Sequence, residues 1–427
     1  GEEAVQEVVE AALHAIGCEV ERVVYTPIGT PLKSEFAAAS AIASGERVAI
    51  VGRWRAVTSS PQNGSTSSRS LIMFAHPDGE DPKAAPAGSG PEHWTRPPFD
   101  AAVEETADGR RVYGWGIADD IMGVAAGVCA MRALHASGLR PNGELIMAST
   151  PSKRHARGCA ELVQRGFTAD AAVYLHPAES GAGLQEIKAY TSGQILFTVS
   201  VKGTLPTTPP PPAGNHPHWA ASHSPEGDGH CAFAFTAANP LDKLLILRDA
   251  LMQLGEQRAQ RLHHPTIHEA AGCSCNVLIS SMRCGFGHDG GRSLSCVQPA
   301  AELGGAITFP PSESLSDVKA EVAACIAAAA SRDAHLSNHP PEVVWVSGVT
   351  GAEVPTSHAL YKTVSGAIEA ATGIAPHVNP MHTSSDIRVP AVQLGVPCVG
   401  FGSRSGNLAQ NGLADEWIDL DDFGRMV

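Results

Sequence analysis

Several features that would indicate other classes of protein are missing from this 427-residue sequence. No CxxC pair occurs among its ten cysteines, which argues against a structural zinc module and favours free thiols in a reducing cytoplasm. No run of 18 or more apolar residues is present, so we expect no membrane span. The first residues lack the basic and then apolar order of a secretory signal, so we expect a cytoplasmic protein.

Positive charge is also scarce in this chain. Lysine and arginine together number 30 against 44 acidic residues, the formal net charge is -14, and no long basic run occurs. Such a surface repels nucleic acid, and we expect neither nucleic acid nor a membrane as a partner. What is present is a globular composition, 43% hydrophobic, in a chain long enough for two domains.

Short apolar strands alternate with helices in the first 192 residues and again after residue 350. The strands are predicted at 47–52, 70–75, 144–148, 171–175 and 396–401, and the helices at 2–16, 121–134 and 358–372. This alternation is typical of a layered α/β sheet. We therefore predict a mixed α/β/α layered catalytic domain made of residues 1–192 and 351–427.

The pattern changes between these two parts of the chain. Residues 194–202 alternate apolar and polar side chains, as a half-exposed antiparallel strand does, and a loop rich in Pro, His and Gly follows at 204–230. The remaining elements are predicted in the order helix, strand, strand, helix, strand, which completes a split βαβ sandwich. We predict that residues 193–350 form this α+β domain, inserted into the catalytic domain.

Polar side chains follow the predicted parallel strands where those strands end. His76 and Asp78 come after one strand, His176 comes after another, and Asp119 follows a tight turn before a helix. The carboxyl ends of parallel strands meet at one edge of a sheet, and mixed histidine and carboxylate ligands suit a catalytic metal. Each residue alone also fits an ordinary structural role, such as an N-cap for the Asp119–Asp120 pair. Their coincidence favours a metal centre.

Three motifs in these places resemble those of a known family. They are FAHPDGE at 74–80, YGWGIADDIMG at 113–123 and YLHPAES at 174–180. In this order and spacing they resemble the aminoacylase and glutamate-carboxypeptidase family of co-catalytic metallopeptidases. The resemblance covers nearly the whole chain, and in that family the inserted domain is a lid and dimerisation domain. It therefore implies a homo-oligomer, at least a dimer through the lid.

The resemblance also implies roles for particular residues. Carried over by position, His76, Asp119 and His176 would be metal ligands, and Asp119 would be the ligand that usually bridges two metals. Asp78 would be the carboxylate that orients His76, and we place Asp78 and Asp119 in the catalytic machinery. Glu179 stands close enough to His176 in the sequence to replace or support it.

The chain departs from the family at the second metal site. The family's adjacent glutamate pair, which supplies the general base and a metal ligand, aligns with Ser152 and Lys153. The family's last histidine ligand aligns with Asn411. A second divalent ion should not bind to a lysine and an amide, so we predict one divalent transition metal per chain. Its mixed ligands suit Mn²⁺ or Zn²⁺, and Fe²⁺ or Co²⁺ nearly as well.

Loss of the glutamate base would slow general-base catalysis by about two to four orders of magnitude. The resemblance, which extends to a ring deaminase built on this scaffold, implies an aminohydrolase in which a metal-bound hydroxide displaces the amino group of an electron-poor aromatic amine, and the loss of the base fits such a substrate. The expected reaction converts 5-nitroanthranilate to 5-nitrosalicylate and ammonia, with His155 and Arg388 as candidate groups that bind the small anionic aromatic substrate. A one-metal amidase or aminoacylase acting on N-acyl amino acids or dipeptides is the first alternative. A non-catalytic ligand-binding relative is the second.

Overall fold

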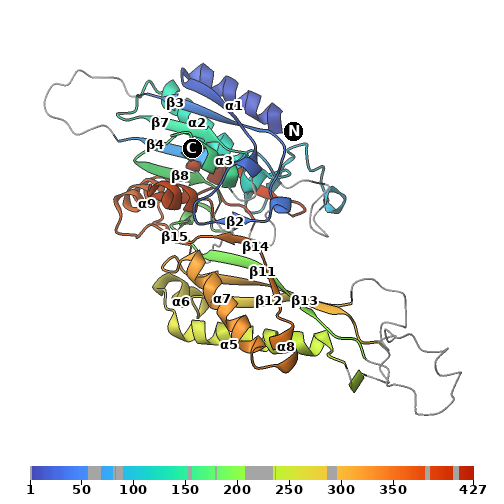
Figure 1. Ribbon diagram of the computed structural model, residues 1–427. Coiled ribbons are helices and arrows are strands. Elements are labelled where there is room, and N and C mark those ends of the chain that lie inside the picture. Colours follow the sequence, from blue (N-terminus) through green and yellow to red (C-terminus); the bar gives the residue numbers. More distant parts are fainter. Residues whose placement is uncertain are drawn as a thin grey trace, which may run out of the picture. The chain divides into compact units, whose positions relative to one another are not determined.

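The computed structural model describes residues 2–55, 69–79, 82, 90–151, 156–177, 180–206, 234–235, 237–285, 296–379, 385–406 and 413–427. Contacts within the chain divide it into two compact units (Figure 1). Unit 1 comprises Gly1–Ser192 with Thr350–Val427, and unit 2 comprises Gly193–Val349. The sequence pattern placed the inserted domain at 193–350. Across the described ranges, no helix has both the length and the apolar character that a membrane crossing requires.

Unit 1 is built on a six-stranded mixed sheet with the strand order β1-β3-β7-β4-β8-β17. The strands from β7 to β17 are parallel to one another, whereas β3 is antiparallel to both of its neighbours, β1 and β7. The strand bounds are β1 (Glu19–Tyr25), β3 (Arg47–Trp54), β4 (Leu71–Ala75), β7 (Leu145–Ser149), β8 (Ala171–Leu175) and β17 (Cys398–Phe401). The parallel part therefore supplies several strand ends at one edge, where catalytic side chains commonly gather.

Helices cover both faces of this sheet (Figure 1). Three helices share a buried apolar cluster with one face, and they are α1 (Glu2–Ile16), α2 (Met122–Ala136) and α9 (Ala359–Thr372). Helix α3 (Arg157–Gln164) shares a second cluster with the opposite face. Strand β8 serves both clusters, because Val173 and Leu175 point to the first and Ala172 and Tyr174 to the second. The predicted α/β/α layering is confirmed.

Unit 2 is an antiparallel sheet with helices packed against it. Its strands run in the order β12-β13-β11-β14. The elements, in chain order, are β11 (Gly193–Lys202), α5 (Pro240–Arg261), α6 (Pro265–Ala271), β12 (Asn276–Cys284), β13 (Ala300–Phe309), α7 (Leu315–Ala330), α8 (Ala334–Asn338) and β14 (Glu342–Val349). Alternate side chains of β11 are buried, and α5 and α7 both contact this strand. The predicted order of the split βαβ sandwich is therefore confirmed.

A small three-stranded sheet in unit 1 joins the end of the chain to the segment that precedes Asp119. Its order is β18-β6-β5, and Trp417 of β18 pairs with Tyr113 of β6. The bounds are β5 (Val103–Thr106), β6 (Gly109–Tyr113) and β18 (Trp417–Asp419), and α10 (Leu420–Met426) follows. Further short strands are β2 (Phe36–Ala37), β9 (Glu186–Ile187), β10 (Tyr190–Thr191), β15 (Ala352–Glu353) and β16 (His377–Val378).

Candidate metal centre

His76 is the first residue after β4, and its side chain is buried. Its backbone N–H donates to Oδ1 of Asp120 at 2.9 Å.

Two glycines lie where the loop after β4 meets the turn before α2. Gly116, with φ of 71°, adopts the left-handed backbone that favours glycine. A Cβ on Gly116 would lie 3.0 Å from Cα of Gly79. The two loops that carry His76 and Asp119 therefore approach each other closely at a pair of glycines.

Asp119 lies in the irregular turn before α2, where its backbone and that of Asp120 are not helical, and the peptide bond between the two is cis. The buried carboxylate of Glu416 holds this turn. Its Oε1 accepts hydrogen bonds from the backbone N–H of Ala118 at 2.7 Å and of Asp119 at 3.0 Å. Its Oε2 accepts from the N–H of Gly116 at 3.2 Å. Three charge-assisted bonds from one buried carboxylate fix the backbone that presents Asp119.

His176 is the first residue after β8, and its side chain is also buried. Its backbone N–H donates to the carbonyl oxygen of Phe401 at 3.0 Å, which joins it to the end of β17. Nδ1 of its ring lies 2.8 Å from the carbonyl oxygen of Pro177 and contacts Nζ of Lys188. The ring of Tyr174 lies 4.9 Å from that of His176. These contacts hold the imidazole with Nε2 directed away from Pro177.

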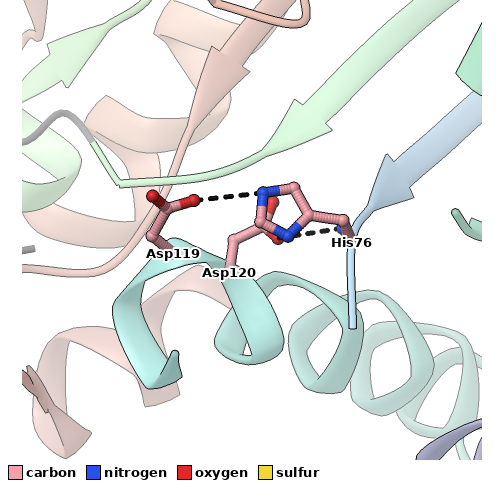
Figure 2. A group of neighbouring side chains, drawn as sticks. All are labelled: His76, Asp119 and Asp120. Carbon is pink, nitrogen blue, oxygen red and sulfur yellow. Dashed lines mark hydrogen bonds and ion pairs between the residues drawn. The ribbon is translucent and has the colours of Figure 1, made fainter. Parts of the chain in front are cut away.

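The three residues expected as ligands meet at one oxygen atom. Oδ1 of Asp119 is 3.0 Å from Nε2 of His76 and 3.2 Å from Nε2 of His176. Figure 2 shows the ring of His76 between the carboxylates of Asp119 and Asp120. The structure thus brings together side chains from the ends of two parallel strands and from the turn before α2.

The carboxylate nearest to Nδ1 of His76 belongs to Asp120. Oδ1 of Asp120 is 2.8 Å from Nδ1, whereas Oδ1 of Asp78, the carboxylate expected to orient this ring, is 3.8 Å away. The backbone oxygen of Asp78 lies 3.0 Å from the same nitrogen. Nδ1 therefore faces two acceptors, so a His76 ring that binds a cation would keep its proton on Nδ1 and offer the lone pair of Nε2 on the side of Asp119. In the structure, Asp120 takes the orienting position expected for the carboxylate of Asp78.

The electrostatics of this group favour a positive charge. Burial alone would lower the pKa of His76, but the carboxylates of Asp120 and Asp119 outweigh it and raise that pKa well above its usual value. Oδ2 of Asp120 is buried and has no hydrogen-bond partner among the described residues. A cation in this place would compensate the negative charge that these carboxylates concentrate.

The residues fit a divalent transition metal. His76, Asp119 and Asp120 form a cluster whose ligand atoms all lie within 4.8 Å of one another, and Nε2 of His176 lies 3.2 Å from Oδ1 of Asp119 at its side. Ligand atoms of a tetrahedral site with bonds of about 2.1 Å are roughly 3.4 Å apart. The observed separations of 3.0 and 3.2 Å between Oδ1 of Asp119 and the two Nε2 atoms are slightly shorter. Two imidazoles with a carboxylate are the donors that Mn²⁺ and Zn²⁺ accept.

Arg388, a candidate for substrate binding, lies in the interior and is paired with two carboxylates. Its guanidinium is buried, with Nε 3.0 Å from Glu35 and Nη1 3.0 Å from Asp386. Glu35 also accepts bonds from the N–H and hydroxyl of Thr350, at 3.1 and 2.7 Å. A guanidinium paired with two carboxylates in the protein interior favours a structural role, and the substrate-binding role of Arg388 stays a prediction. The other candidates lie outside the described residues, and they are Lys153, His155, Glu179, Asn411 and most of the 204–230 loop.

Three residues that shape this centre were not singled out as functional by the sequence pattern. Asp120 adjoins Asp119, and the Asp–Asp pair itself was its signal. Glu416 precedes an apolar segment about 300 residues further along the chain, and nothing in the sequence connects it to the turn at Asp119. Lys188 follows an isoleucine in a short strand-like segment. From the sequence, a lysine there is expected to face solvent, so its burial was not predicted.

Comparison with known proteins identifies related chains. The model of peptidase family M20/M25/M40 matches residues 84–427, which is more than half of the chain. One relative is an N-formyl-4-amino-5-aminomethyl-2-methylpyrimidine deformylase from Halalkalibacterium halodurans, 26% identical over 282 residues. The match covers 66% of this chain and 57% of the deformylase, so it spans little more than half of that protein's length.

Solved structures share the fold. A tripeptidase from Staphylococcus aureus aligns with 100% of this chain and 90% of its own, with a TM-score of 0.64 and 14% identity. The YXEP protein of Bacillus subtilis, described as a dinuclear metal binding peptidase from the M20 family, aligns with 99% of this chain and 88% of its own, with a TM-score of 0.56 and 11% identity. At these identities the similarity establishes a common architecture.

Proposed function

Because the chain belongs to peptidase family M20/M25/M40, we propose that it hydrolyses a carbon–nitrogen bond at a metal centre held by His76, Asp119 and His176. The observation that supports this most directly is the position of Oδ1 of Asp119. It lies within 3.2 Å of Nε2 of both histidines, at an edge of the sheet where the parallel strands end.

A bound divalent cation at these residues would lower the pKa of a water molecule to about 7 and polarise the substrate. The chain's own side chains prepare the centre for that chemistry. Asp120 holds His76 with Nε2 towards Asp119, and Glu416 fixes the turn that presents Asp119. The carbonyl oxygen of Pro177 lies within hydrogen-bond distance of Nδ1 of His176, which leaves Nε2 available as a ligand atom.

We propose one cation per chain, with Mn²⁺ and Zn²⁺ as the expected ions. The support is in the sequence, where Lys153 and Asn411 stand at the positions of two second-site ligands of the family. The dinuclear description of the YXEP protein makes two cations the competing expectation. Metal analysis of the loaded and desalted protein distinguishes one equivalent from two.

For the substrate we propose an electron-poor aromatic amine that carries a carboxylate, such as 5-nitroanthranilate. The favouring observation is Ser152–Lys153, aligned with the family's glutamate pair. A nitro group para to the amine makes the ring carbon electrophilic, so attack by water needs less help from a general base. The water oxygen bonds to the ring carbon and the amino group leaves as ammonia, which is the reaction of 5-nitroanthranilic acid aminohydrolase. The chain's motifs resemble those of that enzyme.

Amide hydrolysis is the second candidate, and the relatives favour it. They are named as a deformylase, a tripeptidase and a peptidase, which are names for the hydrolysis of amide bonds. The same ligands would serve an N-acyl amino acid or a dipeptide, because both reactions add water at an electrophilic carbon.

The test is to incubate metal-loaded protein with 5-nitroanthranilate and, separately, with N-acyl amino acids and dipeptides. Ammonia from the aromatic amine alone would support the first candidate, and free amino acid from the amides alone would support the second. Removal of the metal by a chelator should abolish either activity. Asp119→Ala and His176→Ala should also abolish it, and full turnover by these folded variants would refute the proposed centre. Metal binding without any product would favour the non-catalytic alternative.

A further inference from the structure

Lys188 has a fully buried side chain beside the candidate metal centre. Lysine is rarely buried completely, because its charge is well solvated by water. The backbone around it is fixed, since its N–H donates to the carbonyl of Gly400 at 2.7 Å and the N–H of Gly400 donates back at 2.8 Å. These two bonds attach the segment between β9 and β10 to β17. The position from which the side chain of Lys188 extends is therefore well defined.

The side chain of Lys188 extends to the ring of His176. Its Nζ contacts Nδ1 of His176 and lies 6.0 Å from the centroid of the Tyr174 ring. The carbonyl oxygen of Pro177 is 2.8 Å from the same Nδ1. Lys188 therefore reaches the nitrogen of His176 that faces away from Asp119, and Nε2 on the other side of the ring is the atom available to a cation.

We propose that Lys188 is a positioning residue for the metal centre and acts through His176, an inference that rests on the proposed function. A cation on Nε2 requires the ring proton of His176 to be on Nδ1, so Nδ1–H is the donor, and the amine of Lys188 and the carbonyl oxygen of Pro177 are the acceptors within its reach. The bond fixes the rotation of the imidazole. Partners of this kind, which touch a ligand and not the metal, typically change metal affinity by about 10–100-fold when they are replaced.

The test compares Lys188→Met with the wild type, using Co²⁺ alone as the probe. Methionine keeps an unbranched stem of similar length, with sulfur in place of Cδ, and removes the terminal amine. The dissociation constant for Co²⁺ should rise by about 10–100-fold, and the visible absorption bands of bound Co²⁺ should shift because His176 is less constrained. Circular dichroism and thermal melting of the metal-free proteins establish that both are folded.

Lys319→Met is the matched control. In the wild type, Nζ of Lys319 lies 5.1 Å from the ring centroid of Trp345. This variant therefore also removes an amine near an aromatic ring, but in unit 2. Its Co²⁺ affinity and spectrum should equal those of the wild type. An equal loss of affinity in both variants would overturn the inference.

The outcomes separate this inference from the proposed function. If the wild type does not bind Co²⁺, the metal centre is wrong and the inference is wrong with it. If the wild type binds and folded Lys188→Met has the same affinity and spectrum, only the inference is overturned. A crystal structure of the Co²⁺-loaded wild type covers the case in which Lys188→Met does not fold. A separation of more than about 3.5 Å between Nζ of Lys188 and Nδ1 of His176 would overturn the inference there.

Discussion

At the residue scale, the orientation of His76 depends on Asp120 more than on Asp78. Oδ1 of Asp120 is 2.8 Å from Nδ1 and also accepts the backbone N–H of His76, whereas Oδ1 of Asp78 is 3.8 Å from Nδ1. A charged acceptor at hydrogen-bond distance makes a histidine a better ligand. Asp120→Asn should therefore weaken the binding of Zn²⁺ or Mn²⁺ by about 10–100-fold, as measured by calorimetric titration.

Asp78→Asn is the matched control for that prediction, because it makes the same chemical change in the other carboxylate near Nδ1 of His76. Its effect on metal affinity should be smaller than that of Asp120→Asn, since its carboxylate lies beyond hydrogen-bond distance of Nδ1. A larger loss in Asp78→Asn would mean that the carboxylate identified from the family resemblance orients His76 after all.

The candidate metal ligands could be named from the sequence, because residues that directly follow parallel strands lie at one edge of the sheet. His76 and His176 directly follow apolar strands, and parallel strands end at a common edge. The partners of these ligands could not be derived in this way. The sequence does not show whether Asp78 or Asp120 lies closer to the ring of His76. That depends on the turn at Asp119, which places the carboxylate of Asp120 beside Nδ1. The burial of Lys188 depends on its pairing with Gly400, more than 200 residues away along the chain.

At the scale of elements, the candidate centre depends on an attachment between the end of the chain and the turn before α2. Glu416 accepts three backbone N–H groups there. Glu416→Ala would leave these donors without their acceptor, and each such buried group costs about 1–3 kcal/mol. We expect the free energy of unfolding to fall by about 3 kcal/mol or more in urea denaturation. Glu416→Gln should lose less, because its amide oxygen can still accept from Ala118 and Asp119.

Asp415→Ala provides the control for Glu416→Ala at the neighbouring position. Asp415 accepts bonds from the N–H and hydroxyl of Thr95 in an exposed part of the chain, at 2.9 and 2.8 Å. Exposed donors regain water when their partner is removed, so the loss of stability should be clearly smaller. Equal losses at the two positions would show that the attachment through Glu416 does not stabilise the turn.

The longer helices and strands could be predicted from their apolar periodicity. The attachment of the end of the chain to the turn before α2 could not. The helix predicted at 2–16 is α1, and the strand predicted at 171–175 is β8, with the same bounds. In contrast, β5 and β6 are four and five residues long and include exposed polar side chains. Their pairing with each other and with β18 is set by tertiary contacts, which a local pattern does not contain.

At the scale of the whole molecule, two changes of pattern along the chain correspond to two compact units. Strands β4, β7 and β8 of unit 1 are mostly buried apolar runs, whereas β11 alternates buried and half-buried positions along most of its length. Parallel strands covered on both faces and antiparallel strands covered on one face give these two patterns. The insertion was therefore predictable from the sequence, because the first pattern resumes after the second.

The exposed edge strand of unit 2 predicts how two copies of the chain associate. Strand β12 lies at an edge of its sheet and pairs with β13 on one side. Leu278 and Met282 on this strand are 54% and 38% exposed, and an exposed apolar edge strand favours pairing with another chain. Two copies related by a twofold axis could pair their β12 strands antiparallel, so that the same surface serves both partners. We therefore expect at least a dimer by light scattering of the full chain.

The double variant Leu278→Lys and Met282→Lys should convert that dimer into a monomer, because lysines on an edge strand place like charges opposite each other across the twofold axis. Leu139→Lys, at a 61% exposed apolar position in unit 1, should leave the assembly unchanged. A monomeric wild type would refute the assembly itself. A dimer that persists in the folded double variant would refute β12 as its interface, and the exposed Leu241, Leu245 and Ile246 of α5 would then be the next surface to alter.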